Sequence, residues 1–178
     1  MKPPSLRSGL IALSALALSG CIESAEPILT GAKPVFGQSA SFQLYSLREG
    51  TASEPSQEQF SWTGTHYAPT GGAMTVDAFS AFPYEGDDYL IQSAPAKDGA
   101  KVEYALLHKL ADGVFLARVI DEEDADAATR ARLCAPASKY SCRISTREQL
   151  LALARATAAR KHTDGGLVLR LPDAAAAK

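Results

Sequence analysis

The stretch V-E-Y-A-L-L-H-K-L-A-D-G-V-F-L-A-R-V-I, residues 102–120, decides the fold of this chain. Two apolar, alternating runs, Val102–Leu110 and Val114–Ile120, flank the tripeptide Ala111-Asp112-Gly113. An Asp-Gly pair between two such runs is the strongest short-range signal of a β-hairpin, because these residues tolerate the positive φ angles of tight turns. The stretch therefore predicts two antiparallel strands joined by a short turn.

Four further strands are predicted upstream of this hairpin, each bounded by turn-forming residues. They cover Ser41–Leu47, Phe60–Tyr67, Met74–Phe82 and Tyr89–Gln92, and the segment Pro69–Gly72 is expected to be a turn. Short strands at close spacing are typical of an antiparallel sheet that closes into a barrel or packs as a sandwich. We therefore expect a sheet or small barrel over about residues 41–120, with the choice between barrel and sandwich left open.

The last third of the chain is predicted to be mainly helical. Acidic residues open the segment Asp121–Cys134, and Arg130 and Arg132 close it, the order that complements a helix dipole. Ser145 and Glu148 fit a capping box that starts a helix over about 146–161. The apolar face of that helix is predicted to consist of Leu150, Leu151, Ala154 and Ala158. Two short strands are also expected, Tyr140–Ile144 before the helix and Leu167–Leu171 after it.

The N-terminal segment has the form of a targeting signal. Lys2 and Arg7 give it a positive start, and the apolar run Leu10–Leu18 follows. This run is too short to span a bilayer, for which a helix needs about 20 residues. The segment is therefore left out of the fold.

The run Leu18-Ser19-Gly20-Cys21 at the end of this segment resembles the lipobox of bacterial lipoproteins. The resemblance implies cleavage before Cys21, a diacylglyceryl thioether on its sulfur and an acylated amino group. Several acyl chains on one residue anchor a protein stably, whereas a single chain gives only marginal binding. Ile22 rather than Asp follows the cysteine, which in this family favours the outer membrane, facing the periplasm. The expected organisation is a signal peptide (1–20), a partly packed tether (21–40), a single α+β domain (41–172) and a disordered tail (173–178).

Two cysteines remain after Cys21 is set aside for the lipid, namely Cys134 and Cys142. An even pair in an oxidising compartment is predicted to form a disulfide. A redox-active pair would use a two-residue spacing at a helix start, which this pair lacks. The predicted fold class is therefore α+β: an antiparallel β-sheet or small β-barrel followed by a disulfide-pinned helical segment.

Charge and motif spacing argue against most enzymatic and nucleic-acid functions. Removing Lys2 and Arg7 takes the formal net charge from −2 to −4, and no basic stripe is seen, so a nucleic-acid partner is not expected. No cofactor is implied. The candidate groups lack the spacing of known sites. The acidic run 121–126 has no calcium-loop glycine, and Glu85–Asp88 has the form of a solvated turn. The histidines, His66, His108 and His162, are scattered, and Ser39 and Ser41 do not lie in a G-x-S-x-G motif. Neither a catalytic residue nor a metal ligand is predicted.

Two weak signals point to binding. Aromatic residues gather between positions 60 and 89, and Trp62, Tyr67 and Tyr84 suit half-wet positions in an apolar pocket or interface. The tripeptide Ser138-Lys139-Tyr140 faintly resembles the loop of periplasmic lysozyme-inhibitor lipoproteins, in which a basic side chain meets catalytic carboxylates. That resemblance covers three residues and lacks the glycines of the motif.

These observations predict a non-enzymatic module, anchored to the bacterial cell envelope through Cys21. Its expected partner is a protein or a small apolar ligand, bound through the β-domain. One alternative is an inhibitor of an envelope-targeting hydrolase such as lysozyme, acting through Lys139. The other is a hydrolase whose site residues are too scattered for the sequence to show.

Overall fold

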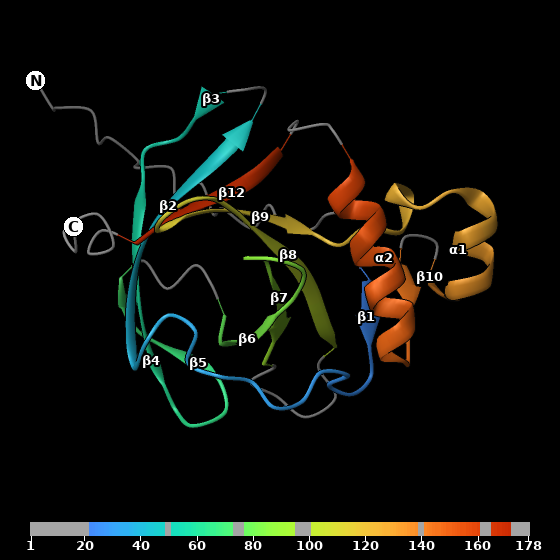
Figure 1. Cartoon of the computed structure of the whole chain (residues 1–178), viewed down its shortest axis with the longest axis horizontal. Helices are drawn as coiled ribbons and strands as arrows, with labels where there is room; N and C mark the ends of the chain where they lie inside the picture. Colours follow the sequence, from blue (N-terminus) through green and yellow to red (C-terminus); the bar gives the residue numbers. More distant parts are fainter. Residues whose placement is uncertain are drawn as a thin grey trace, which may run out of the picture.

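An eight-stranded antiparallel β-barrel forms the centre of the molecule (Figure 1). The computed structural model describes residues 22–48, 51–72, 77–94, 101–138, 141–160 and 165–171. The barrel strands are β2 (Ser39–Arg48), β4 (Ser56–Trp62), β5 (Tyr67–Gly72), β6 (Phe79–Pro83), β7 (Tyr89–Ser93), β8 (Val102–Ala111), β9 (Val114–Val119) and β12 (Gly165–Arg170). Each strand pairs with the next along the chain, and β12 closes the barrel by pairing with both β9 and β2. Of the two predicted alternatives, a barrel and a sandwich, the structure is a barrel.

The predicted hairpin at residues 102–120 is confirmed. Strands β8 and β9 pair from Ala105 opposite Val119 to Ala111 opposite Val114. Gly113 takes a φ of 71°, which glycine adopts without the steric cost that a side chain brings. The turn therefore lies where the Asp-Gly pair places it.

The predicted strand Phe60–Tyr67 is wrong as a single element. Strand β4 ends at Trp62, and β5 begins at Tyr67. The intervening turn is closed by the backbone N–H of Thr63, which donates to the carbonyl of His66 over 2.9 Å. The glycines expected to form a turn at Pro69–Gly72 belong to β5 instead.

The predicted helix Asp121–Cys134 is also divided in two. A 3-10 turn, η1 (Glu122–Asp124), precedes α1 (Ala127–Leu133). Ala125 ends the first, and Asp126 caps the second, because the Asp126 carboxylate accepts from the backbone N–H groups of Ala128 and Thr129. The acidic run therefore supplies caps rather than one continuous helix.

Helix α2 (Arg147–Ala159) is confirmed, with its cap shifted by one residue. Thr146 and Gln149 form the capping box that was expected from Ser145 and Glu148. The buried face consists of Leu150, Leu153, Ala154 and Thr157. Leu150 and Ala154 belong to the predicted apolar face; Leu151 and Ala158 are not among its buried residues.

A small sheet extends the barrel beside β8. It contains β1 (Ile22–Ser24), β10 (Ala135–Ser138) and β11 (Ser141–Arg143), and a two-residue strand, β3 (Thr51–Ala52), pairs with β2. The predicted disulfide is confirmed: Cys134 and Cys142 are bonded and close the β10–β11 hairpin. Part of the expected tether is thus a strand of the domain, whereas the signal peptide and the tail lie outside the described residues.

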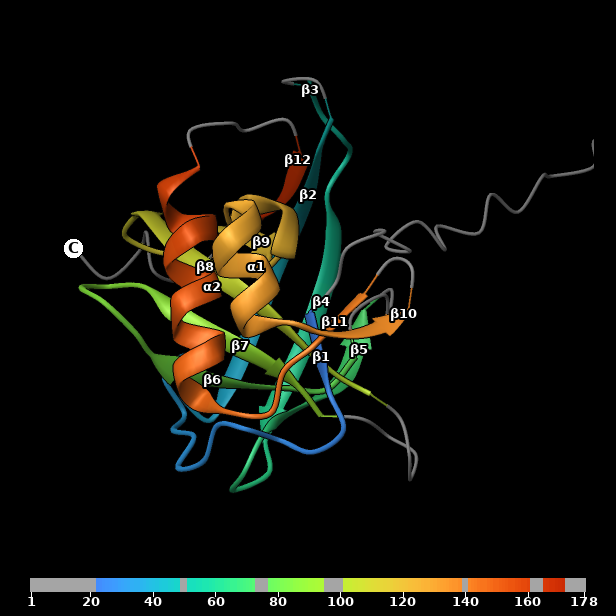
Figure 2. The ribbon, with the colours of Figure 1, turned by 90° about the vertical axis from the view of Figure 1, so that its right-hand side faces the viewer.

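The fold has two apolar cores, one on each side of the barrel wall. The outer core lies between the barrel and the helices, where Leu90, Tyr104 and Leu106 pack against Leu150 and Leu153 (Figure 2). The side chains at alternate positions of the same strands point the other way, into the barrel. Among the described residues, no helix is long and apolar enough to cross a membrane.

Aromatic rings fill the barrel interior. The ring of Phe36 has centroid distances of 5.3 Å to Phe42, 5.7 Å to Tyr67, 5.6 Å to Tyr89 and 5.8 Å to Phe115. These four rings come from β2, β5, β7 and β9, so they meet at one point only because all of them face inward. The segment before β2 therefore inserts a ring that joins the barrel walls.

The interior packing predicts a large cost for removing one of its rings. Phe42 is 1% exposed, so Phe42→Ala should lower the free energy of unfolding by about 3–5 kcal/mol through lost burial and a cavity. Leu110→Ala is the control, because Leu110 is 53% exposed and its truncation should cost less than about 0.5 kcal/mol. Urea unfolding measures both, and equal effects would contradict the filled interior.

Candidate functional site

The strand register brings an acid and a histidine together at one end of the barrel. Tyr89 of β7 pairs with Leu107 of β8, so the next position on each strand places Asp88 opposite His108. The two residues are 20 positions apart in the chain. Only the pairing of the two strands makes them neighbours.

The Asp88 carboxylate orients the His108 ring. Nδ1 of His108 lies 3.0 and 2.9 Å from the two carboxylate oxygens, and because these oxygens only accept, Nδ1 donates. The backbone N–H of Lys109 donates to the same carboxylate over 3.0 Å. Asp88 is 17% exposed and His108 is 48% exposed, so a shielded acid fixes an accessible imidazole whose Nε2 lies on the far side of the ring.

Lys109 joins two further carboxylates beside this pair. Its Nζ lies 3.0 Å from Asp87 and 3.3 Å from Asp112. Hydrogen bonds to Asp87, and then to Asp112, raise the pKa of Lys109, so the ammonium stays charged. Lys109 thus holds the β6–β7 loop against the β8–β9 turn.

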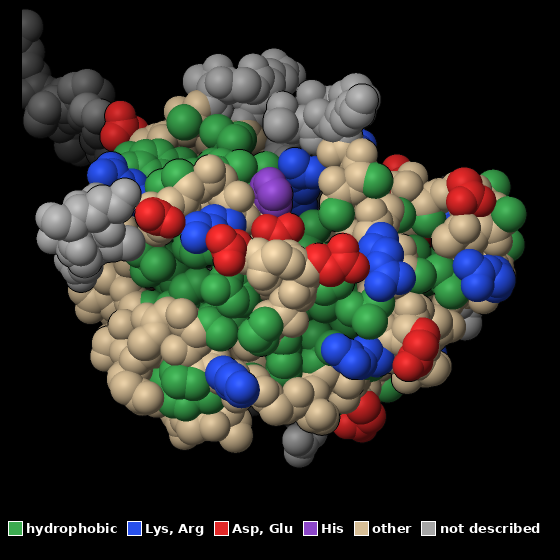
Figure 3. Space-filling model, viewed as in Figure 1, with side chains coloured by type: hydrophobic (Ala, Val, Ile, Leu, Met, Phe, Trp, Pro, Cys, Tyr) green, Lys and Arg blue, Asp and Glu red, His purple; other side chains and the backbone are tan. Residues whose placement is uncertain are grey.

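These side chains line a depression of about 460 Å³ that is open to solvent, which we call the barrel-end depression. It is formed by Glu85, Gly86, Asp87, Asp88, His108, Lys109, Leu110, Ala111 and Asp112. Four carboxylates and one lysine give it a formal charge of −3 with His108 neutral. Figure 3 shows acidic and basic side chains interleaved around a histidine on this face.

The Asp88–His108 pair has one of the parts that base catalysis needs. A histidine oriented by a carboxylate is the arrangement of a general base, which needs a nucleophile within hydrogen-bond reach. The residues that line the depression include no serine, threonine or cysteine. The pair therefore has water as its only nucleophile at this site.

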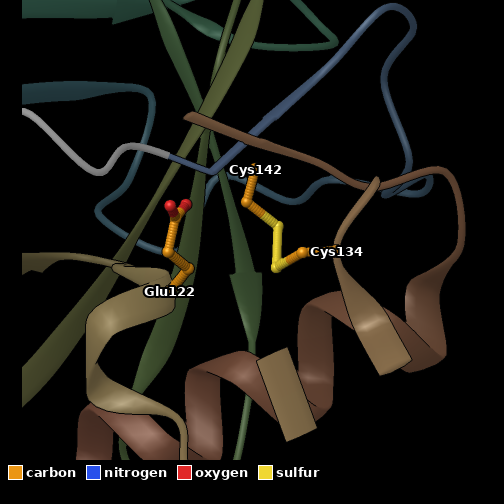
Figure 4. Close-up of side chains that lie close together, drawn as sticks. All are labelled: Glu122, Cys134 and Cys142. Carbon is orange, nitrogen blue, oxygen red and sulfur yellow. A yellow bond between two sulfur atoms is a disulfide. The ribbon is translucent and has the colours of Figure 1, made fainter. Parts of the chain in front are cut away.

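A second titratable group lies beside the disulfide. The Glu122 carboxylate and the sulfurs of Cys134 and Cys142 lie within 4.8 Å of one another. Figure 4 shows the Glu122 side chain beside the disulfide. These are the three residues in the described part of the chain whose spacing would suit a metal ion. The two sulfurs are bonded to each other in the disulfide and cannot serve as thiolate ligands. The oxidised protein therefore has no metal site at these three residues.

Burial changes the acidity of Glu122. Its Oε2 is buried and has no hydrogen-bond partner. Desolvation raises the pKa of Glu122, and the charge of Asp121 raises it further. Protonation of Glu122 is therefore more favourable in the folded protein than in the unfolded chain.

The structure separates the three predicted aromatic binding residues. Trp62 and Tyr67 pack together with ring centroids 5.1 Å apart, inside the barrel cluster. Tyr67 is fully buried, and its hydroxyl donates to the carbonyl of Gly37 while it accepts from the N–H of Phe36; burial raises its pKa. Tyr84 packs against the other core, so the three residues do not line one pocket.

Two predicted site residues lie outside the described part of the chain. Cys21 precedes the first described residue, and Lys139 falls between Ser138 and Ser141. The roles predicted for Cys21 and Lys139 stay predictions. The disulfide cysteines, Cys134 and Cys142, lie where the prediction placed them.

Sequence reasoning missed the Asp88–His108 pair. In the sequence, Asp88 belongs to the predicted solvated turn Glu85–Asp88, and His108 is one of three scattered histidines. The only signal in the sequence was the adjacency of the predicted strands Tyr89–Gln92 and Val102–Leu110. Adjacency does not set which residues face each other, because the register depends on how the connecting loop closes.

Comparison with known proteins adds no identity to this geometry: no family model matches the chain, and neither a curated protein nor a solved structure matches it.

The hydrogen bonds of Asp88 predict that its charge supports this end of the barrel. Asp88→Asn should lower the free energy of unfolding by about 1–2 kcal/mol, because two donors lose a charged acceptor. Asp87→Asn is the matched control: Asp87 is 74% exposed, and its substitution should leave stability nearly unchanged. Urea unfolding at neutral pH measures both, and a similar loss in the two variants would contradict the role of Asp88.

The raised pKa of Glu122 predicts a pH-dependent gain in stability on its neutralisation. A carboxyl whose pKa is raised on folding contributes stability at low pH that is lost as the pH rises through the folded pKa. Glu122→Gln removes that loss, so its free energy of unfolding should exceed the natural protein's at pH ~8 and match it below pH ~4. Chemical denaturation across this range tests the sign, with the exposed neighbour variant Glu123→Gln as the control. Destabilisation by Glu122→Gln at high pH would contradict the assignment.

Proposed function

We propose that this protein is a lipid-anchored binding module of the bacterial cell envelope that recognises its partner on the outer surface of the barrel. The single observation that carries the proposal is the filled interior. Rings from four strands converge on Phe36 inside the barrel. A barrel that binds a small molecule keeps a cavity between its walls, whereas in the described part of this barrel aromatic side chains occupy the space around Phe36.

The barrel-end depression is the surface best suited to a partner. Its lining residues carry a formal charge of −3, one carboxylate of which, Glu85, is ion-paired with Arg155 over 3.1 Å. The depression also holds an oriented imidazole and Leu110, the exposed large apolar side chain of the described residues. A surface that pairs carboxylates with an apolar contact favours a partner carrying lysine or arginine side chains. The partner class is therefore a protein with a basic patch, in preference to a small apolar ligand.

A non-enzymatic role fits this site. The Asp88–His108 pair lacks a nucleophile in the lining of the depression, and Lys109 is held by two carboxylates. The pair is also the one observation that favours the alternative of a hydrolase, with water as the nucleophile. Asp88→Asn separates the two, because it would abolish base catalysis by His108 while leaving most of the depression's charge in place.

The lipid anchor supports the envelope location. The proposed location depends on Cys21, which lies at the end of a short apolar segment. Acyl chains on this residue would hold the module at a membrane without a spanning helix. The outer membrane facing the periplasm is the proposed site.

The anchor predicts a loss of membrane association when Cys21 is replaced. Cys21→Ser should move the protein from the membrane fraction to the soluble periplasmic fraction, because serine cannot form the thioether that carries the lipid. Mass spectrometry of the natural protein should find the acyl mass on the N-terminal peptide that begins at residue 21. Unmodified Cys21 in membrane-associated natural protein would contradict lipid anchoring.

The depression predicts charge-dependent partner capture from envelope extracts. Asp87→Lys should lose a partner that the natural protein retains, because it reverses one of the four carboxylates. Glu54→Lys, an equal change at an exposed position outside the depression, is the matched control. Capture of the same partners by both variants would contradict binding at this site.

A further inference from the structure

The folded domain begins at the residue that directly follows Cys21. Ile22 opens β1 and is 0% exposed, within the outer core. It pairs with Cys142 of β11, and its backbone N–H donates to the carbonyl of Ile120 over 3.4 Å. Ile22 is therefore part of the domain interior and not the start of a tether.

The next two residues fix β1 by polar contacts. Glu23 is 5% exposed, and its carboxylate lies 2.5 Å from Lys101 and 3.6 Å from Arg143. Ser24 is hydrogen-bonded through Oγ to the hydroxyl of Tyr104 over 2.7 Å. If β1 came away from the domain, Lys101 and Arg143 would lose the Glu23 carboxylate, and the Tyr104 hydroxyl would lose its hydrogen bond to Ser24.

The disulfide holds the strand that receives β1. Cys142 lies on β11 beside Ile22, and its bond to Cys134 ties β11 to the end of α1. The backbone N–H of Ile144 donates to the carbonyl of Glu23 over 2.9 Å, so the pairing continues past the strand. Figure 2 shows β1 and β11 next to each other, beside the lower end of α1. Both neighbours of β1, which are β8 and β11, are therefore held in place.

We propose that the domain is seated directly against the bilayer that holds Cys21, without a flexible stalk. The inference rests on the proposed lipidation of Cys21. Adjacent Cα atoms are about 3.8 Å apart, so the lipid-bearing residue lies one peptide unit from a fully buried side chain. The occupant of the surface around the start of β1 is accordingly the lipid headgroup layer.

Direct seating also limits the reach of the barrel-end depression. Because β1 is antiparallel to β8 and Glu23 pairs with Glu103, Ile22 is level with Tyr104, and Lys109 follows five residues further along β8. Strand residues advance by about 3.3 Å, so the depression lies about 17 Å along the strand from Ile22. Its partner has to approach the membrane surface to within that distance.

The test compares the natural junction with one that contains a flexible linker. Twelve Gly/Ser residues inserted between Cys21 and Ile22 would add a reach of about 20 Å. A fluorophore is placed on Ala25→Cys, an exposed position just after β1. The lipidated proteins are purified from membranes and reconstituted in phosphatidylethanolamine–phosphatidylglycerol vesicles whose headgroups carry nitroxide quenchers.

Direct seating predicts at least about threefold stronger quenching with the natural junction than with the inserted linker, because the label then stays near the headgroups. Equal quenching of the two proteins would overturn direct seating while leaving lipid anchoring intact. Mass spectrometry before reconstitution separates the other failure: an unmodified Cys21 would overturn both the anchor and the seating. Matching urea unfolding curves for the two proteins establish that the insertion leaves β1 in place.

Discussion

The structure depends on the pairing of β8 with three other strands. β7 and β9 flank it within the barrel, and β1 takes the place beside it where β9 has ended. The same strand divides the two cores, because Tyr104 and Leu106 face the helices while Leu107 faces the other way. A shift of one residue in β8 would exchange these faces and disrupt both cores at once. The β8–β9 hairpin is therefore needed both to close the barrel and to provide the surface against which the helices pack.

The outer layer is held by fewer and more varied contacts than the barrel. The disulfide closes a short loop, and such a cross-link contributes about 2–3 kcal/mol by restricting the unfolded chain. The caps of α1 and α2 satisfy helix ends that would otherwise lose hydrogen bonds. Together with β1, these features keep the helices against one side of the barrel. In this layer the Oε2 atom of Glu122 is buried beside the disulfide without a hydrogen-bond partner.

Much of the fold could be predicted because its signals are local. The Asp-Gly turn, the apolar alternation of the strands and the spacing of the cysteines each depend on residues close in the chain. The predicted elements are wrong where a local sequence pattern is compatible with two structures. Phe60–Tyr67 has strand-forming composition throughout, and only the return of β5 along β4 requires a turn in its middle. The acidic run also suits a helix start, yet Asp126 caps a later one.

The sequence by itself determined the antiparallel hairpin, the amphipathic helix, the disulfide and the expectation of a lipid on Cys21, because each is written in a short pattern. The tertiary structure decided that the sheet closes into a barrel, since closure requires β12 to reach β2 across most of the chain. It also decided that rings fill the interior, that Asp88 meets His108, and that Ile22 belongs to the core. These are matters of register and long-range packing, whose energies depend on residues that no local pattern brings together.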